Sequence, residues 1–315
     1  MPDFHKPPPA VLTFAATDPS GGAGLTADIL TLASMGCHPL SVITAITVQD
    51  TSGVEGMTAI DADWVSDQAR AILEDIPIAA FKIGAMGSVE NISAIAEIVS
   101  DYPEIPLVLD PILTSGRGDE YANEEVLEAI RELLIPQCTV ITPNTPALRR
   151  LMISDEEDAE IVGQGIEKLA MRLIDIGAEY VLVTGRHEPT ADVINTLFHE
   201  KGHLRSDTWR RLPGRFHGAG CTLASAIAAT MARGLDIEDA VREAQDYTWQ
   251  ALKFGFRPGM GQLVPDRLFW ARDDEDDKED KEDKDDKDDK ESEANPATDD
   301  APPLSKHTST DGVRH

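Results

Sequence analysis

The chain has 315 residues, of which 57 are acidic and 28 basic, and its formal net charge is −29. So acidic a chain repels a phosphodiester backbone, and nucleic acid is not an expected partner. Three widely spaced cysteines form neither a zinc pattern nor an obvious disulfide framework, and no apolar run approaches the length of a membrane span. We therefore expect a cytoplasmic protein with no membrane partner.

The two ends of the chain lack the pattern of a packed domain. Residues 1–10 are predicted to be a short extension. From 273 to 290 the chain consists only of Asp, Glu and Lys, and the stretch from 291 to 315 is rich in Ser, Thr, Pro and Asp. Such a composition buries too little apolar surface to offset the entropy of ordering. We therefore predict a disordered acidic tail at 273–315 and a single domain at 11–272.

Short apolar runs and amphipathic segments alternate along this domain. The runs predict strands at 11–16, 41–48, 79–86, 106–112, 139–144 and 180–185. The amphipathic segments predict helices at 25–35, 63–74, 89–99, 124–133 and 165–176. Most of the apolar runs are continuous, which is typical of strands buried on both faces of a parallel sheet. The pattern predicts a three-layer αβα domain with a mostly parallel central sheet.

The pattern changes after Gly185. Two β-like runs on either side of Lys201-Gly202 predict an antiparallel hairpin at the edge of the sheet. A last helix is expected at about 237–253.

Two glycine-rich segments are candidate ligand sites, because open α/β sheets bind ligands at the carboxyl ends of their strands. DPSGGAG at 18–24 and HGAGC at 217–221 each precede a predicted helix, whose N-terminus attracts anions. The first segment fits a structural turn equally well. In the second, Cys221 lies where the helix field favours a thiolate, so we expect its pKa to be lowered. A buried structural cysteine is the alternative.

These two segments belong to a longer series. In order along the chain it reads DPSGGAGLTADI (18–29), TAITVQDTSGV (44–54), KIGAM (82–86), LDPI (109–112), TPN (142–144) and HGAGCTLASAIAA (217–229). The series resembles the hydroxymethylpyrimidine/phosphomethylpyrimidine kinases of the ribokinase-like superfamily, over about 11–270. The resemblance implies a ribokinase-like domain, commonly a homodimer, that uses ATP and Mg²⁺. Its substrates would be 4-amino-5-hydroxymethyl-2-methylpyrimidine and the corresponding monophosphate, in thiamine biosynthesis.

The resemblance assigns substrate contacts to three positions. Gln49 matches the glutamine that reads the pyrimidine, and a carboxamide does complement an amine beside a ring nitrogen. Asp28 and Gly24 match residues of the pyrimidine pocket. From the residues alone, Gln49 could be a solvated loop residue, and Asp28 could serve only the dipole of its helix.

Catalytic roles fall to the second glycine-rich segment. Cys221 stands where other ribokinase-like enzymes have a catalytic aspartate, so the resemblance implies that it accepts the proton of the hydroxymethyl group. Gly218 and Gly220 would contribute backbone N–H groups that hold the transferring phosphoryl group.

The nucleotide side is assigned to three further positions. Asp110 matches an acidic residue near Mg²⁺ and the phosphates, although a turn residue before proline is the alternative. Asn144 and Thr184 follow two neighbouring predicted strands and match nucleotide contacts.

Four positions depart from the family pattern. Ala147 replaces a glutamate that helps to organise Mg²⁺, Ala219 replaces a threonine, and Ala85 replaces a methionine. The loop at 184–187 reads TGRH and lacks a common lysine. Two alternative functions therefore remain: a pyridoxal or pyridoxine kinase, and a pyrimidine-binding protein with little kinase activity.

Overall fold

The computed structural model describes residues 7–114, 122–152 and 164–272. Met1–Phe269 form one unit and Trp270–His315 a second, of which 270–272 are described. The predicted acidic tail lies outside the described residues.

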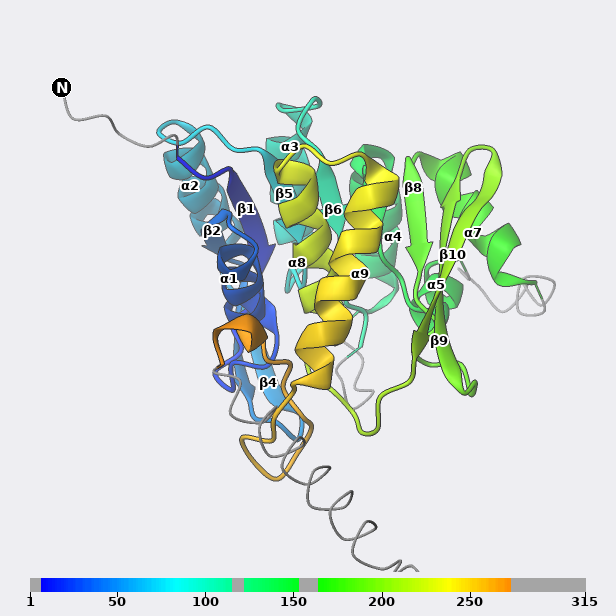
Figure 1. The fold of residues 1–315 in the computed structure, drawn as a ribbon. Helices are drawn as coiled ribbons and strands as arrows, with labels where there is room; N and C mark the ends of the chain where they lie inside the picture. The colour runs from blue at the N-terminus through cyan, green and yellow to red at the C-terminus, as the bar shows by residue number, and fades with distance from the viewer. Residues whose placement is uncertain (1–6, 115–121, 153–163, 273–315) are drawn as a thin grey trace, which may run out of the picture. The chain divides into compact units, whose positions relative to one another are not determined.

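Eight strands of the described chain form the main sheet, in the order β10-β9-β8-β7-β6-β5-β1-β2 (Figure 1). They are β1 (Ala10–Ala15), β2 (His38–Ile43), β5 (Ala80–Ile83), β6 (Leu107–Leu109), β7 (Val140–Ile141), β8 (Tyr180–Val183), β9 (Asp192–His199) and β10 (Gly202–Arg210). Six of these strands run parallel, and the predicted hairpin β9–β10 pairs antiparallel at one edge. The mostly parallel sheet expected from the continuous apolar runs is confirmed.

A separate two-stranded sheet departs from the prediction. The apolar run 41–48 is not one strand, because β2 ends at Ile43 and the chain continues as β3 (Ala45–Gln49), which pairs with β4 (Val54–Ala59). The division lies at the fully buried Thr44, whose hydroxyl donates to the Ala85 carbonyl oxygen at 2.6 Å. Beyond it Ile46 and Val48 are exposed, so their apolar character did not indicate a buried strand.

Helices cover both faces of the main sheet (Figure 1). One layer consists of α1 (Gly24–Ser34), α8 (Ala219–Ala232) and α9 (Ile237–Lys253). The other consists of α2 (Ala62–Leu73), α3 (Val89–Ser100), α4 (Glu124–Ala129), α5 (Thr145–Met152) and α7 (Ile166–Ile176). A π-helical turn, η1 (Ile130–Leu134), continues α4, and short 3₁₀ turns are η2 (Ile135–Gln137) and η3 (Phe269–Ala271). No described helix is long and apolar enough to cross a membrane.

Helix α8 sets the position of the site. Its sequence from Ala219 to Thr230 consists mostly of small residues, and Gly220 is the one exposed position in that stretch. Small side chains allow the helix to contact β1, β5 and β6 closely. The N-terminus of α8 therefore lies at the carboxyl ends of the central strands, where ligands bind in open α/β folds.

Candidate active site

The start of α8 meets the carboxyl end of β6. Asp110 directly follows that strand, and a Cβ atom added at Gly220 would lie 3.6 Å from Asp110 Oδ2. The Cys221 thiol and the Asp110 carboxyl group are close enough for each to shift the pKa of the other. The structure thus brings Cys221, Gly220 and Asp110 together, as the sequence assignments require.

The two glycine-rich segments are in direct contact. Gly218 adopts a φ of +82°, and a side chain there would overlap the Gly22 carbonyl group. Gly24, with a φ of +55°, leaves no room for a side chain against the Ala16 carbonyl oxygen, and its backbone is close enough to Cys221 to lower the pKa of that thiol. Glycine is required at both positions, because an L side chain would be strained and would separate the segments.

The pKa of Cys221 is the reverse of the expectation. Burial raises the pKa of this thiol to about 12, and the nearby Asp110 and Asp28 carboxyl groups add to the rise. The Lys82 ammonium group acts in the opposite direction but does not compensate. The predicted lowered pKa is wrong, because the field of a helix N-terminus is smaller than the desolvation penalty of a fully buried thiolate.

Asp110 has a carboxylate oxygen available for a ligand. The residue is 8% exposed, and its Oδ2 atom has no hydrogen-bond partner among the described residues. Burial raises the pKa of Asp110 to about 6, while Lys82 lowers it. A buried acceptor without a protein partner is costly, which indicates that a ligand completes its coordination.

Asp28 lies in a buried ion pair. Both of its oxygens are 2.9 Å from Lys82 Nζ, and neither side chain has any exposed surface. Thr13 and Ser225 each donate a hydroxyl hydrogen bond of 2.8 Å to the same carboxylate. Four hydrogen bonds satisfy the Asp28 carboxylate and connect it to β1, β5 and α8, and its contact with the substrate stays a prediction. A Cβ atom at Gly84 would lie 2.8 Å from the ammonium nitrogen, so glycine leaves room for it.

Sequence reasoning missed Lys82. The residue stands in an apolar run whose pattern indicates only a buried strand. A lysine within such a run is itself a signal, since a buried ammonium group requires a charged partner.

Gln49 is in contact with the second glycine-rich segment. Its Nε2 atom lies 2.7 Å from Nε2 of His217, and the same His217 nitrogen lies 2.8 Å from Asp18 Oδ2. Residues from β3 and from the loops after β1 and before α8 therefore meet at one point. Sequence reasoning did not single out His217, which it treated only as the first residue of HGAGC.

Two residues predicted to contact the nucleotide, Asn144 and Thr184, lie just beyond the ends of β7 and β8. Asn144 and Thr184 form a parallel β-bridge. The Asn144 side-chain oxygen accepts a 2.9 Å hydrogen bond from the Ala147 N–H group at the start of α5. Arg186 donates a 2.9 Å hydrogen bond to the Phe216 carbonyl oxygen and so connects this loop to the segment before α8.

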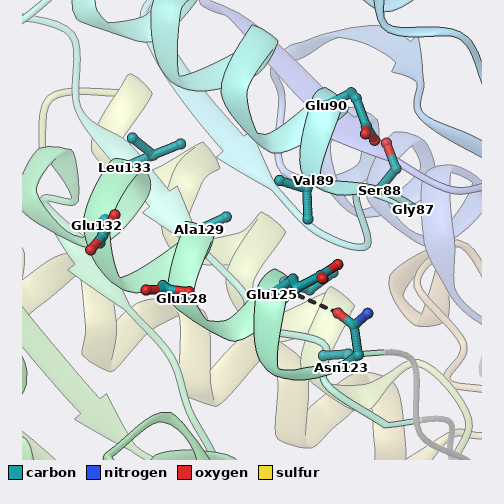
Figure 2. A pocket seen from close by; sticks show the side chains of 12 residues that line it. Gly87, Ser88, Val89, Glu90, Asn123, Glu125, Glu128, Ala129, Glu132 and Leu133 are labelled. Carbon is teal, nitrogen blue, oxygen red and sulfur yellow. Dashed lines mark hydrogen bonds between the residues drawn. The ribbon is translucent and has the colours of Figure 1, made fainter. Parts of the chain in front are cut away.

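A pocket of about 810 Å³ opens elsewhere, between the start of α3 and α4–η1 (Figure 2). Its lining comprises Gly87, Ser88, Val89, Glu90, Ala122, Asn123, Glu125, Val126, Glu128, Ala129, Glu132 and Leu133. None of the predicted site residues lines it. Its four glutamates repel polyphosphate, so we do not assign the nucleotide to this pocket.

The comparison with known proteins shows to which family the chain belongs. A family model described as phosphomethylpyrimidine kinase matches residues 18–266. The chain belongs to this family. A hydroxymethylpyrimidine/phosphomethylpyrimidine kinase from Streptomyces coelicolor is 36% identical over 270 residues, which cover 84% of this chain and 96% of the relative.

Two solved structures extend the comparison. A phosphomethylpyrimidine kinase from Clostridium difficile matches with a TM-score of 0.65 at 32% identity and covers 78% of this chain and 99% of its own. A pyridoxal kinase from Staphylococcus aureus, in complex with AMP-PCP and pyridoxal, matches with a TM-score of 0.72 at 26% identity, with 84% and 95% coverage. The ribokinase-like fold predicted from the sequence is confirmed.

Within the phosphomethylpyrimidine kinase family, Ala147 remains the sharpest departure. The residue is 7% exposed and packs in the larger hydrophobic core. The side chain that the family resemblance places there is a carboxylate, and this chain has none at that point.

The buried ion pair yields a test of stability. Lys82→Met leaves the Asp28 carboxylate uncompensated, so we expect a loss of about 3–5 kcal/mol in the free energy of unfolding. Replacing both residues, as Asp28→Asn with Lys82→Met, should recover much of this loss because no isolated charge remains. Urea unfolding measures both variants, with Lys168→Met on the exposed face of α7 as the control. A Lys82→Met variant within about 1 kcal/mol of the parent, close to the error of the extrapolation, would contradict the assigned role.

Proposed function

We propose that this site transfers the γ-phosphoryl group of ATP to the hydroxymethyl group of 4-amino-5-hydroxymethyl-2-methylpyrimidine, and then a second one to the monophosphate. The observation that carries the proposal is the free Oδ2 atom of Asp110 facing the N-terminus of α8. A helix N-terminus binds phosphate oxygens, and a facing carboxylate suits the metal ion that accompanies them.

The transfer itself needs little covalent chemistry from the protein. The hydroxymethyl oxygen forms a bond to the γ-phosphorus while the bond to the β–γ bridging oxygen breaks and ADP leaves. The transition state is loose, so positioning and charge stabilisation outweigh the strength of any base. The first N–H groups of α8, from Gly218 to Cys221, have no intrahelical partners and are suited to hold the moving phosphoryl group.

Cys221 is assigned a positioning role toward the attacking hydroxyl. A thiol with a pKa of about 12 stays protonated at neutral pH and cannot act as a preformed thiolate. A loose transition state does not require a thiolate, since the hydroxyl proton can transfer to an oxygen of the phosphoryl group late in the reaction. The thiol instead orients the hydroxymethyl group by hydrogen bonding.

This role distinguishes two variants of Cys221. Cys221→Ser keeps a hydrogen-bonding hydroxyl and should retain kcat within about 10-fold of the parent, whereas Cys221→Ala should lose about 100-fold or more. Steady-state kinetics on the pyrimidine measures both. Equal, severe losses in the two variants would instead indicate that the thiolate is the base.

ATP is the phosphoryl donor in this proposal, and Arg186 adds to the expected contacts at Thr184 and Asn144. Among the described residues Arg186 forms no ion pair, and its guanidinium group donates only to a carbonyl oxygen. Burial lowers the pKa of Arg186, and the neighbouring charges of Arg215 and Arg211 lower it further. Positive charge without a protein counter-ion beside the start of α8 supports a polyphosphate site.

Mg²⁺ fits the residues present. Mg²⁺ is commonly held by one or two carboxylates together with substrate phosphates, and Asp110 offers one free carboxylate oxygen. No group of three or more potential metal ligands lies within the described ranges, in keeping with an ion shared with ATP. Asp110 would hold the ion, which neutralises phosphate charge when bound.

The magnesium requirement can be tested at Ala147. Ala147→Glu introduces the carboxylate that the family pattern has at this position. It should lower the Mg²⁺ concentration for half-maximal turnover by about 10-fold, because losing a residue that orients a metal ligand typically weakens metal binding by such a factor. Ala147→Gln is a matched control, because it places the same volume at a 7% exposed position without the charge. Turnover is measured against Mg²⁺ at fixed ATP. Superimposable curves for the two variants would show that position 147 does not act on the ion.

Pyridoxal phosphorylation is the second candidate, supported by the likeness to the Staphylococcus aureus pyridoxal kinase. Gln49 favours the aminopyrimidine, because a carboxamide pairs with an amine beside a ring nitrogen, whereas pyridoxal carries a phenolic oxygen.

An ADP-release assay with both substrates separates the candidate functions. We expect kcat/KM for the hydroxymethylpyrimidine to exceed that for pyridoxal by at least about 10-fold, the equivalent of one well-placed polar contact. The reverse order would make the protein a pyridoxal kinase. Tight pyrimidine binding with no ADP release at any Mg²⁺ concentration would make it a binding protein.

A homodimer in the cytoplasm completes the proposal. The side chains of Ile46 and Val48 on β3 are 54% and 61% exposed, and a second copy of the chain could cover them. Cys37, Cys138 and Cys221 are all free thiols, which suits a reducing compartment.

A further inference from the structure

The carboxamide of Gln49 is not free to turn. As placed, its Nε2 atom lies 2.7 Å from His217 Nε2, and that ring nitrogen also lies 2.8 Å from Asp18 Oδ2. A neutral imidazole nitrogen carries either a proton or a lone pair, so Asp18 and Gln49 together determine which one is present.

Asp18 requires the proton on His217 Nε2. Although burial disfavours its charged form, hydrogen bonds from His217, Ser20 and the Ala23 backbone hold the pKa of Asp18 below its usual value. Asp18 is therefore an ionised acceptor, and a lone pair on His217 facing it at 2.8 Å would be repulsive. Nε2 therefore carries the proton, and this one proton is shared in a three-centre hydrogen bond between the Asp18 carboxylate and the Gln49 atom that faces the same nitrogen.

The same proton fixes the orientation of Gln49. Two N–H groups facing each other at 2.7 Å cannot form a hydrogen bond, so the carboxamide atom facing His217 is the oxygen. Exchanging the amide nitrogen and oxygen moves no heavy atom, because the hydrogen-bond network alone distinguishes them. The oxygen then accepts one branch of the three-centre bond from His217 with one lone pair and keeps a second, while the NH₂ group points away.

We propose that His217 is a specificity-determining positioning residue, which turns the Gln49 carboxamide into the orientation that reads an aminopyrimidine. The free lone pair of the amide oxygen accepts from the substrate amine, and the NH₂ group donates to the adjacent ring nitrogen. This inference rests on the proposed function, since it assigns the pyrimidine edge to Gln49.

The surroundings of His217 hold its ring in place before substrate binds. Its backbone N–H donates to the Leu263 carbonyl oxygen at 2.8 Å, and a side chain at Gly22 would overlap the ring. Arg267, 3% exposed, donates hydrogen bonds to the carbonyl oxygens of Gly21 and Gly22 at 3.3 and 2.5 Å. These contacts hold the imidazole ring of His217 in a single position beside Asp18. The orientation of the Gln49 carboxamide is therefore fixed before substrate binds.

Two substitutions of His217 isolate the hydrogen bond. His217→Leu removes the donor at similar size, so we expect KM for the hydroxymethylpyrimidine to rise about 10-fold, with a smaller change in kcat. The ratio of kcat/KM for this substrate over pyridoxal should fall by a similar factor. His217→Gln offers an amide N–H near the position of Nε2 and should restore the ratio to within about 3-fold of the parent.

A matched control perturbs the other side of Asp18. The Ser20 hydroxyl donates to Asp18 Oδ1 at 2.7 Å, so Ser20→Ala disturbs the same loop without touching the bond to His217. Its substrate ratio should equal that of the parent. Thermal melting of each variant, with and without the pyrimidine, identifies any loss of fold.

The results separate this inference from the proposed function. An unchanged ratio in folded His217→Leu, or a His217→Gln variant no better than the leucine variant, would overturn the positioning role. If His217→Leu does not fold, a parent-like ratio in His217→Gln together with an altered ratio in folded His217→Asn sustains the role, and equal ratios overturn it. A parent protein that does not phosphorylate the pyrimidine at all would instead refute the proposed function.

Discussion

The buried ion pair between Lys82 and Asp28 is the interaction on which the site depends. It joins β5 to α1, and the hydroxyl groups of Thr13 on β1 and Ser225 on α8 complete it. Four elements from three separate stretches of the chain, β1–α1, β5 and α8, are thereby held to one another next to the glycine-rich segments. Removing either charge alone would leave the other without compensation in a medium of low polarity.

The charges of this ion pair also affect the pKa values of Asp110 and Cys221. The Lys82 ammonium group lowers the pKa values of both Asp110 and Cys221, whereas burial raises them more strongly, and Asp28 adds to the rise. The result is a site with a protonated thiol beside a carboxyl group whose pKa is about 6. A site of this kind suits phosphoryl transfer, where arranged charges and donors matter more than a strong base.

Much of the fold could be predicted from the sequence. Continuous apolar runs indicate strands buried on both faces, and the alternation of these runs with amphipathic segments indicates a sheet covered by helices. The hairpin at β9–β10 and helix α9 were found in the same way. Strand β4 was missed because its residues, Val54–Ala59, have a weak and mixed apolar pattern. The division at Thr44 depends on a hydroxyl contact with Ala85, which no local pattern contains. The predicted direction of the Cys221 pKa shift was wrong for a related reason. How deeply a residue at the start of a helix is buried depends on tertiary packing, which no local pattern contains.

In the proposed function, the side chain that reads the pyrimidine and the groups that hold phosphate come from different sheets, although His217 of the segment before α8 contacts both parts. Gln49 belongs to the two-stranded sheet β3–β4, whereas Asp110 and the start of α8 belong to the main layers. A hairpin outside the central sheet can accept insertions and exchanges without repacking the core. Evolution could therefore have altered what the protein recognises by editing a short hairpin while its chemistry stayed intact, and a protein engineer could graft hairpins between relatives to the same end.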